Sequence, residues 1–408
     1  MILDRLPGLI DKVFPLPERF RVGLPRDVAE LSRLLTSGRP ERGASYLGKP
    51  GLLSAYLRYF LPWNIYRLSR LFTSLPLELK PNDAVNDLGA GPLTLAAALW
   101  ISRPALRNIP LEFRCLDRTP AVLDAGKKFF AALTAGTDCP WTVRTIRGDV
   151  KRNGRLSVEI RGKPAALSAA VNVYNELFWD FSPLDIEELE RFTESQARLL
   201  SSLTESSGSI LVVEPGIPRS GEFISLLRSF LMEEGRNPLA PCTHTGDCPM
   251  PGGRTENRHR TGTGGKARWC HFAFDTDDAP KELHKLSAAA RIPKERAVLS
   301  FLLAGSALVQ RPVKKSDKRE PRFKETAQEK HGKVRVISDV FPVGGERDSG
   351  AYSWGRYGCG EHGLFLVTGS RAVIEETPSG ALEELSLNGD KDAKSGAFLA
   401  VKKATDKI

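Results

Sequence analysis

The chain has 408 residues and a formal net charge of +10, and 41% of its residues are hydrophobic. These values indicate a folded globular protein, and the positive charge favours an acidic partner, most often nucleic acid, over a basic protein without one. Six cysteines in a chain this long exclude a disulfide scaffold, and no apolar run approaches the length of a membrane span. Charged residues interrupt the apolar residues of segment 1–16, so we expect no signal peptide and a cytoplasmic protein.

Residues 1–80 are predicted to form a helical N-terminal region, because apolar residues recur there at helical spacing. The richest part is Leu52–Leu75, where aromatic residues alternate with arginines. Aromatic rings beside arginines suit stacking on RNA bases, but periodic aromatics more often face a core, and we favour packing against the sheet. The residues concerned are Tyr56, Tyr59, Phe60, Trp63, Tyr66 and Phe72, with Arg58, Arg67 and Arg70.

Residues 81–235 show the alternating pattern of strands and helices that builds a doubly wound parallel sheet. The first strand ends at Asp87, and a corner containing Gly89 and Gly91 leads into an alanine-rich helix. Glycines at such a corner let the backbone turn sharply and let a nucleotide-like ligand approach the helix N-terminus. The second strand ends at Asp117, which suits a ribose diol, and Asp149 follows the third strand and fits a position near adenine. These acidic strand ends favour a class I S-adenosylmethionine-dependent methyltransferase domain over a nicotinamide enzyme.

The fourth strand is predicted over Ala169–Leu177 and the fifth over Ser209–Gly216. In this fold the end of the fourth strand lies beside the reactive methyl group. Asn175 and Glu176 are therefore the candidate substrate-contacting residues, with capping of the following helix as the favoured alternative.

Cysteines cluster in residues 236–310, which we predict to be a metal-binding insertion that returns to the sheet. Cys242, Cys248 and Cys270 lie on irregular segments, and thiolates at such spacing suit zinc or an iron–sulfur cluster. Cys359, flanked by glycines, is the best fourth candidate, and His244 or His271 replaces it if the metal is zinc. We expect Cys115 to be a core residue of the second strand, and Cys139 has no partner nearby in sequence.

The remaining segments include two basic loops, Pro251–Lys266 and Arg311–Lys333, the second of which we treat as a separate segment, 311–333. Contact with RNA phosphates is favoured over solvated insertions. Residues 334–377 are predicted to form a small β-rich unit that contains Cys359, and 378–408 a polar, partly disordered tail.

Four stretches in this order and spacing resemble a family of methyltransferase-like assembly factors of the mitochondrial ribosomal small subunit and its bacterial relatives. The resemblance spans about residues 45–370. It implies a four-iron four-sulfur cluster on Cys242, Cys248, Cys270 and, less closely matched, Cys359, and binding to small-subunit ribosomal RNA. The long basic loop before Cys270 departs from the family pattern. The four stretches are Asp87–Pro92, Glu214–Gly216, Ala240–Pro249 and Trp269–Phe272.

The sequence thus predicts a monomeric RNA-binding protein with an S-adenosylmethionine pocket and a cysteine-ligated cluster, acting in assembly of the small subunit or in translation. The first alternative is an active RNA methyltransferase. The sequence lacks the two motifs that would support it: the Asn/Asp-Pro-Pro-aromatic motif of base-amine methylation, and a Pro-Cys pair at the fourth strand, which marks carbon methylation. The second alternative is a zinc-stabilised methyltransferase for a small molecule, which would have little use for the basic loops.

Overall fold

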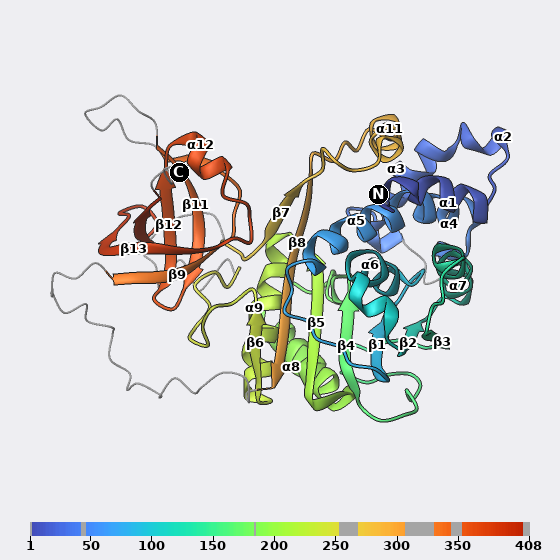
Figure 1. Cartoon of the computed structure of the whole chain (residues 1–408), viewed down its shortest axis with the longest axis horizontal. Helices are drawn as coiled ribbons and strands as arrows, with labels where there is room; N and C mark the ends of the chain where they lie inside the picture. The colour runs from blue at the N-terminus through green and yellow to red at the C-terminus, as the bar shows by residue number, and fades with distance from the viewer. Residues whose placement is uncertain are drawn as a thin grey trace. The chain divides into compact units, whose positions relative to one another are not determined.

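The computed structural model describes residues 2–41, 46–182, 185–252, 268–306, 330–343 and 353–402 (Figure 1). The chain divides into two compact units. The first consists of Met1–Phe181, Ser195–Glu214 and Phe274–Val298, and the second of Ser182–Glu194, Pro215–Ala273 and Leu299–Ile408.

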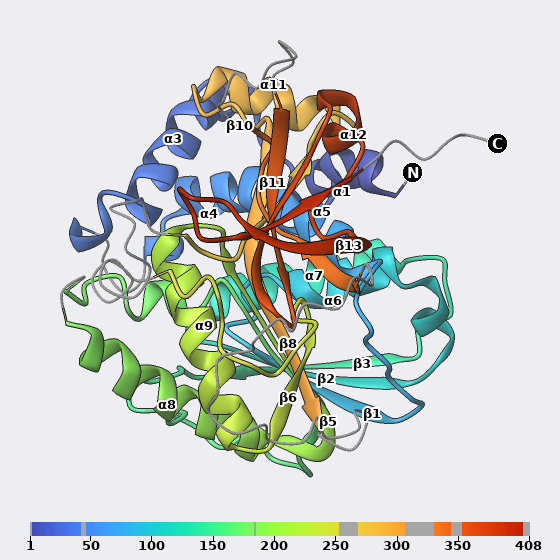
Figure 2. The same cartoon turned by 90° about the vertical axis from the view of Figure 1, so that its left-hand side faces the viewer.

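Helices open the first unit, as the sequence predicts. They share one apolar core with a helix from late in the chain, α11 (Lys281–Ala289), which lies beside α3 in Figure 2. Pro residues occupy the first turns of α1, α3, α4 and α5, where their missing N–H is not needed by the helix. The bounds are α1 (Leu6–Val13), α2 (Glu18–Arg21), α3 (Leu24–Leu35), α4 (Pro50–Ala55), the π-turn Tyr56–Phe60 and α5 (Leu61–Phe72).

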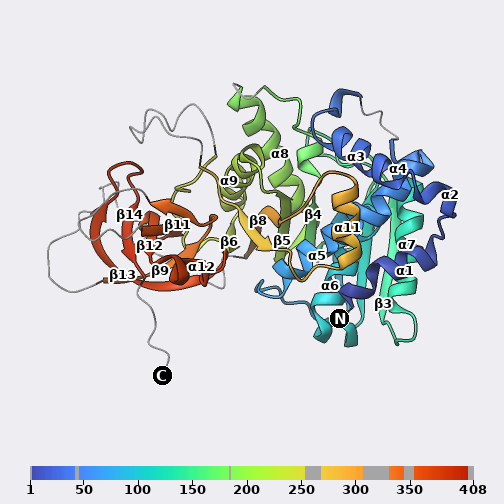
Figure 3. The ribbon, with the colours of Figure 1, turned by 90° about the horizontal axis from the view of Figure 1, so that it is seen from above.

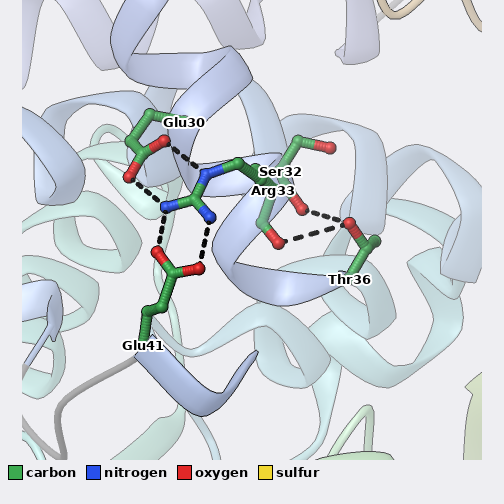
Figure 4. Close-up of polar contacts among 5 residues, drawn as sticks. All are labelled: Glu30, Ser32, Arg33, Thr36 and Glu41. Carbon is green, nitrogen blue, oxygen red and sulfur yellow. Dashed lines mark hydrogen bonds and ion pairs between the residues drawn. The ribbon is translucent and has the colours of Figure 1, made fainter. Parts of the chain in front are cut away.

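Arg33 joins the end of α3 to the short turn that follows it. Its guanidinium donates to both carboxylate oxygens of Glu30 and of Glu41, at 2.7 to 3.0 Å (Figure 4). Thr36 completes the helix end by donating its hydroxyl to the backbone oxygen of Ser32 at 2.8 Å. The hydrogen bonds from Arg33 hold the pKa values of both carboxyl groups below their usual range.

The aromatic residues of α4 to α5 pack into the core rather than standing free for RNA. Tyr59, Trp63 and Tyr66 are all at least 96% buried within the helical core. The arginines are engaged as well: Arg58 pairs with Asp11 at 3.1 Å, and Arg67 donates to the backbone oxygen of Val298. These aromatic residues therefore face a core, as favoured, but it is the core shared by the helices rather than the sheet.

A parallel sheet follows the helices, with the strand order β3-β2-β1-β4-β5 in the first unit. Strand β1 is central, and its register with β2 places Asp87 opposite Cys115. Helices follow β1, β2, β4 and β5, whereas residues 148–164 connect β3 to β4 without a helix. The parallel pairing and the strand order confirm the predicted doubly wound sheet. The elements are β1 (Asp83–Leu88), α6 (Thr94–Ser102), β2 (Leu111–Asp117), α7 (Pro120–Thr134), β3 (Trp141–Arg147), β4 (Ala165–Val171), α8 (Ile186–Leu203) and β5 (Thr204–Pro215).

The fourth strand differs from its predicted span. Strand β4 ends at Val171, because Asn172 takes a left-handed conformation with φ +55° that takes the chain out of the extended region. The chain continues as the 3-10 turn Tyr174–Glu176, in which Tyr174 and Asn175 are buried.

The second unit contains α9 (Pro218–Glu233), β6 (Arg236–Ala240) and most of β8 (Arg296–Ser306). Strand β6 pairs antiparallel with β8, and β7 (Phe272–Asp275) also pairs with β8. The cysteine segment 241–252 therefore leaves directly from a strand end, and Cys270 lies two residues before β7.

A second sheet of six strands ends the chain, and Figure 3 shows its strands wrapped around one another. The order β9-β11-β12-β14-β13 returns to β9, so five strands close a barrel, with β10 paired to the start of β11. Its core contains Val334, Phe365, Val367, Leu385 and Ala400. The elements are β9 (Lys330–Val336), β10 (Phe341–Val343), β11 (Ser353–Gly360), β12 (Gly363–Gly369), α12 (Arg371–Glu375), β13 (Leu382–Lys391) and β14 (Phe398–Val401).

The expected polar tail, 378–408, is instead largely structured. Strands β13 and β14 complete the barrel. On β13 the exposed Glu384 and Ser386 flank the buried Leu385, as expected for a strand with one buried face, and on β14 Ala400 is buried. The predicted β-rich unit therefore extends to about residue 402.

Most of the two predicted basic loops, residues 253–267 and 307–329, lies outside the described residues. Within the part of the chain that the structure describes, no helix is long and apolar enough to cross a membrane.

Candidate functional site

The glycine corner after β1 adopts the conformation that its sequence predicts. Gly89 and Gly91 have φ values of +68° and +54°, which favour glycine. A Cβ on Gly89 would lie 2.5 Å from Cγ2 of Val173, so a side chain there would clash with the side chain of Val173. The corner therefore requires glycine both for its backbone angles and for close packing.

Asp117 at the end of β2 fixes this corner. One carboxylate oxygen accepts a hydrogen bond from the backbone N–H of Gly91 at 3.0 Å, and the other from that of Thr119 at 2.8 Å. Each oxygen retains a further lone pair, so the carboxylate can still accept from a ligand hydroxyl.

A pocket of about 280 Å³ opens at the carboxyl ends of the parallel strands. Gly89, Asp117, Asp149 and Glu176 line it, while Asp87, Gly91 and Asn175 do not. Its edge is charged, since Lys151 pairs with Asp149 at 2.8 Å and Arg118 with Glu176 at 3.5 Å. The other lining residues are Arg118, Gly148, Val150, Lys151, Arg152, Asn172, Val173 and Leu177.

Asp87 lies beneath the corner and is 1% exposed. Within the described residues, neither of its carboxylate oxygens has a hydrogen-bond partner. Burial, together with the nearby Asp117 carboxylate, raises its pKa to about 8. At neutral pH this buried acid therefore carries a proton, and a cation bound at the corner would favour its ionised form.

Substituting Asp87→Asn is expected to stabilise the ligand-free protein in a pH-dependent way. The folded state holds a proton that the unfolded chain releases above pH 3.8, so the free energy of unfolding of the wild type falls as the pH rises toward 8. The gain from asparagine is expected to be small near pH 4 and to grow, at no more than about 1.4 kcal/mol per pH unit, up to pH 8. Urea unfolding at pH 4.5 and pH 8 measures it, and an equal difference at both pH values would contradict the explanation.

A buried network centred on Glu214 holds the segment after β4. Sequence reasoning missed it, since the only signal was a strand that ends in an acid. Its carboxylate accepts from the backbone N–H groups of Val173, Tyr174 and Asn175 at 2.9 to 3.2 Å. Arg39 donates to the backbone oxygen of Asn175. Asn175 is therefore a buried part of this network, while Glu176 faces the pocket.

The four predicted cysteine ligands come together around one cavity in the second unit. Cys242, Cys248, Cys270 and Cys359 all line it, from the segment after β6, the approach to β7 and strand β11. His244 also lines it, with Nε2 3.1 Å from the Sγ of Cys359, whereas His271 stacks on Trp269 and is not part of the lining.

Two arginines border this cysteine cavity. Arg228 of α9 donates to the backbone oxygens of His244 and Gly246 at 2.9 and 2.7 Å, and Arg335 of β9 donates to that of Pro241 at 3.2 Å. Burial raises the pKa of Cys242 to about 11, with a further contribution from Cys248, and also raises the pKa values of Cys270 and Cys359. Without a bound cation these three thiols are protonated at neutral pH.

No group of three or more His, Cys, Asp or Glu side chains in the described ranges is arranged to hold a metal ion as it stands. The structure thus places the four cysteines around a shared cavity, and their role as ligands stays a prediction. Of the other cysteines, Cys115 is buried in β2, as expected, and Cys139 precedes β3 without joining the cavity.

The strand order and the glycine corner define the class: the first unit has a class I S-adenosylmethionine-dependent methyltransferase fold. A family model described as mitochondrial small ribosomal subunit Rsm22 matches residues 111–338, more than half of the chain. The chain therefore belongs to this family, which confirms the resemblance. The match includes Cys242, Cys248 and Cys270 but ends before Cys359.

Solved structures similar to the chain are methyltransferases. A class I S-adenosylmethionine-dependent methyltransferase from Listeria monocytogenes is 11% identical, with 77% of this chain and 88% of that one covered and a TM-score of 0.36. Geranyl diphosphate C-methyltransferase from Streptomyces coelicolor is also 11% identical, with 59% and 78% covered and a TM-score of 0.31. No curated protein matches the chain in sequence.

Proposed function

We propose that this methyltransferase-like member of the Rsm22 family binds small-subunit ribosomal RNA during ribosome assembly or translation and carries a [4Fe–4S] cluster and an S-adenosylmethionine pocket. The observation that carries the proposal is the gathering of four cysteines, from three separate segments, around one cavity. We also propose that it acts in the cytoplasm, although the family description names the mitochondrial subunit.

The residues around the cysteine cavity fit a thiolate-bound metal centre. Four thiolates are the usual ligands of a [4Fe–4S] cluster and also suit zinc, which is the alternative. Either centre carries two net negative charges with its four thiolates, and the two arginines at the cavity supply two positive ones. Bound there, the centre would supply a cross-link between the segment after β6, the approach to β7 and strand β11.

The pocket of the first unit fits S-adenosylmethionine in its polar groups. Asp117 offers acceptors at the end of β2. Asp87 does not line the pocket, but the positive charge of the sulfonium and ammonium groups bound nearby would favour its ionised form.

Asp117→Ala is expected to weaken S-adenosylmethionine binding by about 10-fold or more, because hydrogen bonds to a charged group are lost and the corner at Gly91 loosens. Calorimetry measures the affinity. Asp124→Ala, which removes an exposed acid of α7, is the matched control and should bind as the wild type does. Equal affinities for all three proteins would remove Asp117 from the site.

Methyl transfer to RNA is the alternative function, and Glu176 is the residue that favours it, since it lines the pocket at the end of β4. Asn175 is a weaker candidate for contact with substrate, because its backbone and side chain lie in the Glu214 network.

Sedimentation of a cell lysate tests the proposed function directly. The protein is expected to migrate with the small ribosomal subunit at low salt and to be released as salt rises, because contacts from basic residues to phosphates release counterions. If the protein sediments unbound at every salt concentration, the proposal is contradicted. If it stays bound to the subunit regardless of salt, phosphate contacts are excluded as the basis of binding.

A further inference from the structure

The C-terminal barrel has the connectivity of an oligonucleotide-binding (OB) fold. Numbered along the chain as strands 1 to 5, β9, β11, β12, β13 and β14 close in the order 1-2-3-5-4-1. Strands 3 and 5 (β12 and β14) are parallel, and all other neighbouring pairs of the ring are antiparallel. A helix, α12, lies between strands 3 and 4. OB folds bind oligonucleotides or oligosaccharides on the outer face of strands 2 and 3.

The pairing register identifies that outer face here. On β12, Phe365 and Val367 point into the barrel core, so Leu366 between them points to the outer face, where it is itself buried. Leu366 pairs opposite Tyr357 of β11, and Gly355 pairs opposite Phe341 of β10. Tyr357 and Phe341 therefore share the outer face, as their ring distance of 5.0 Å shows.

Cationic groups flank these two aromatic rings. The guanidinium of Arg268 lies 5.1 Å from the ring centre of Tyr357 and donates to the backbone oxygen of Ser395, in the loop between β13 and β14, at 2.9 Å. This loop is the second element that OB folds use for binding. It carries the exposed Lys394, while Asp392 accepts from the backbone N–H of Ser395 and closes the turn.

We infer that this aromatic face, formed by Phe341, Tyr357, Arg268 and the loop 392–397, binds single-stranded RNA by stacking bases on its rings. The rings of Phe341 and Tyr357 are half-buried and lie beside an arginine. OB folds bind single strands by stacking bases on aromatic rings, with a contribution from arginine, and each stacked base increases the affinity. Of the eight acidic residues described in this region, four lie elsewhere, at the end of α12 and on the first part of β13: Glu375, Glu376, Glu383 and Glu384. The inference rests on the proposed RNA-binding function and assigns part of it to a surface.

The test uses the full-length, metal-loaded protein with a labelled, unstructured 12-nucleotide RNA and a 12-base-pair RNA duplex. The wild type is expected to bind the single strand more tightly than the duplex. Phe341→Leu/Tyr357→Leu keeps apolar side chains but removes both ring planes, and should weaken binding to the single strand by about 10-fold or more. Lys394→Ala should lower the salt dependence of the affinity by about 0.7 in log–log slope.

Arg371→Ala is the matched control, since Arg371 also stacks on an aromatic ring, that of Trp354 at 4.7 Å, but belongs to α12. It should bind RNA as the wild type does. Metal content is measured for every variant, so that loss of the metal centre is not mistaken for loss of the face.

Unchanged affinity in the leucine double variant, or an equal loss in Arg371→Ala, would overturn the inference and leave the proposed function standing. The inference would also be overturned if the wild type cosediments with the small subunit but does not bind the single-stranded 12-nucleotide RNA. That result would point to a protein or oligosaccharide ligand for the barrel. A wild type that binds neither RNA nor subunit would overturn both proposals.

Discussion

Cys270→Ser is expected to lose at least about nine-tenths of the bound metal, because it removes one thiolate from a centre whose affinity depends on all its ligands. Serine is nearly isosteric, and the backbone oxygen of Cys270, which accepts from Ser300 at 2.7 Å, is unaffected. The apparent melting temperature should therefore fall mainly through loss of the metal. Metal and sulfide analysis of anaerobically purified protein measures the effect.

The control for this variant is Cys139→Ser, which removes a thiol that does not line the cavity. It should retain full metal content. A brown protein with broad absorption near roughly 400 nm indicates iron–sulfur, and a colourless one with zinc indicates the alternative. Full metal content in Cys270→Ser would remove this residue from the proposed ligand set.

Glu214→Ala is expected to lower the free energy of unfolding by about 3–5 kcal/mol, because three backbone N–H groups lose their acceptor inside the protein. Glu214→Gln should cost less, since its amide oxygen still accepts from Val173 and Tyr174 while its NH₂ group opposes the N–H of Asn175. Urea unfolding at constant pH gives both values.

Glu205→Ala is the matched control, because Glu205 belongs to the same strand but is exposed. Its effect should stay within about 0.5 kcal/mol. Affinity for S-adenosylmethionine should fall in Glu214→Ala as well, since Val173 and Glu176 line the pocket. A loss of stability in Glu214→Ala no larger than in the control would show that solvent or a shifted backbone satisfies the freed donors.

The sequence predicted the sheet well where local pattern and burial agree. Strands ending at Asp87 and Asp117 are found within a residue of their predicted positions, since apolar runs and glycine corners mark their ends. Strand β4 was extended too far because the apolar residues Val173, Tyr174 and Leu177 continue past its end, through the 3-10 turn Tyr174–Glu176. The tail was missed because β13 exposes one polar face and so resembles a polar segment, and because the apolar run of β14 is only Phe398–Val401.

The candidate site was predictable only in part, for a physical reason. Sequence spacing marked Cys242, Cys248 and Cys270, but the position of Cys359 depends on the pairing of β11 with β9, where Cys359 lies opposite Arg335. Such pairing between distant segments has no local signature. The same holds for Glu214, whose partners lie about 40 residues earlier, and for the barrel face, which depends on strand register.

The long basic loop before Cys270 widens the spacing of the cysteines in sequence, but its two ends meet in space. Pro251 forms an antiparallel bridge with Trp269, and the N–H of Gly252 donates to the oxygen of Arg268 at 2.9 Å. These two backbone contacts hold the ends of the loop together, and with them the segments that carry Cys248 and Cys270, whatever the number of residues between them. Since the entropy of closing a loop grows only with the logarithm of its length, homologous proteins are free to lengthen or shorten this excursion while their cysteines stay in place.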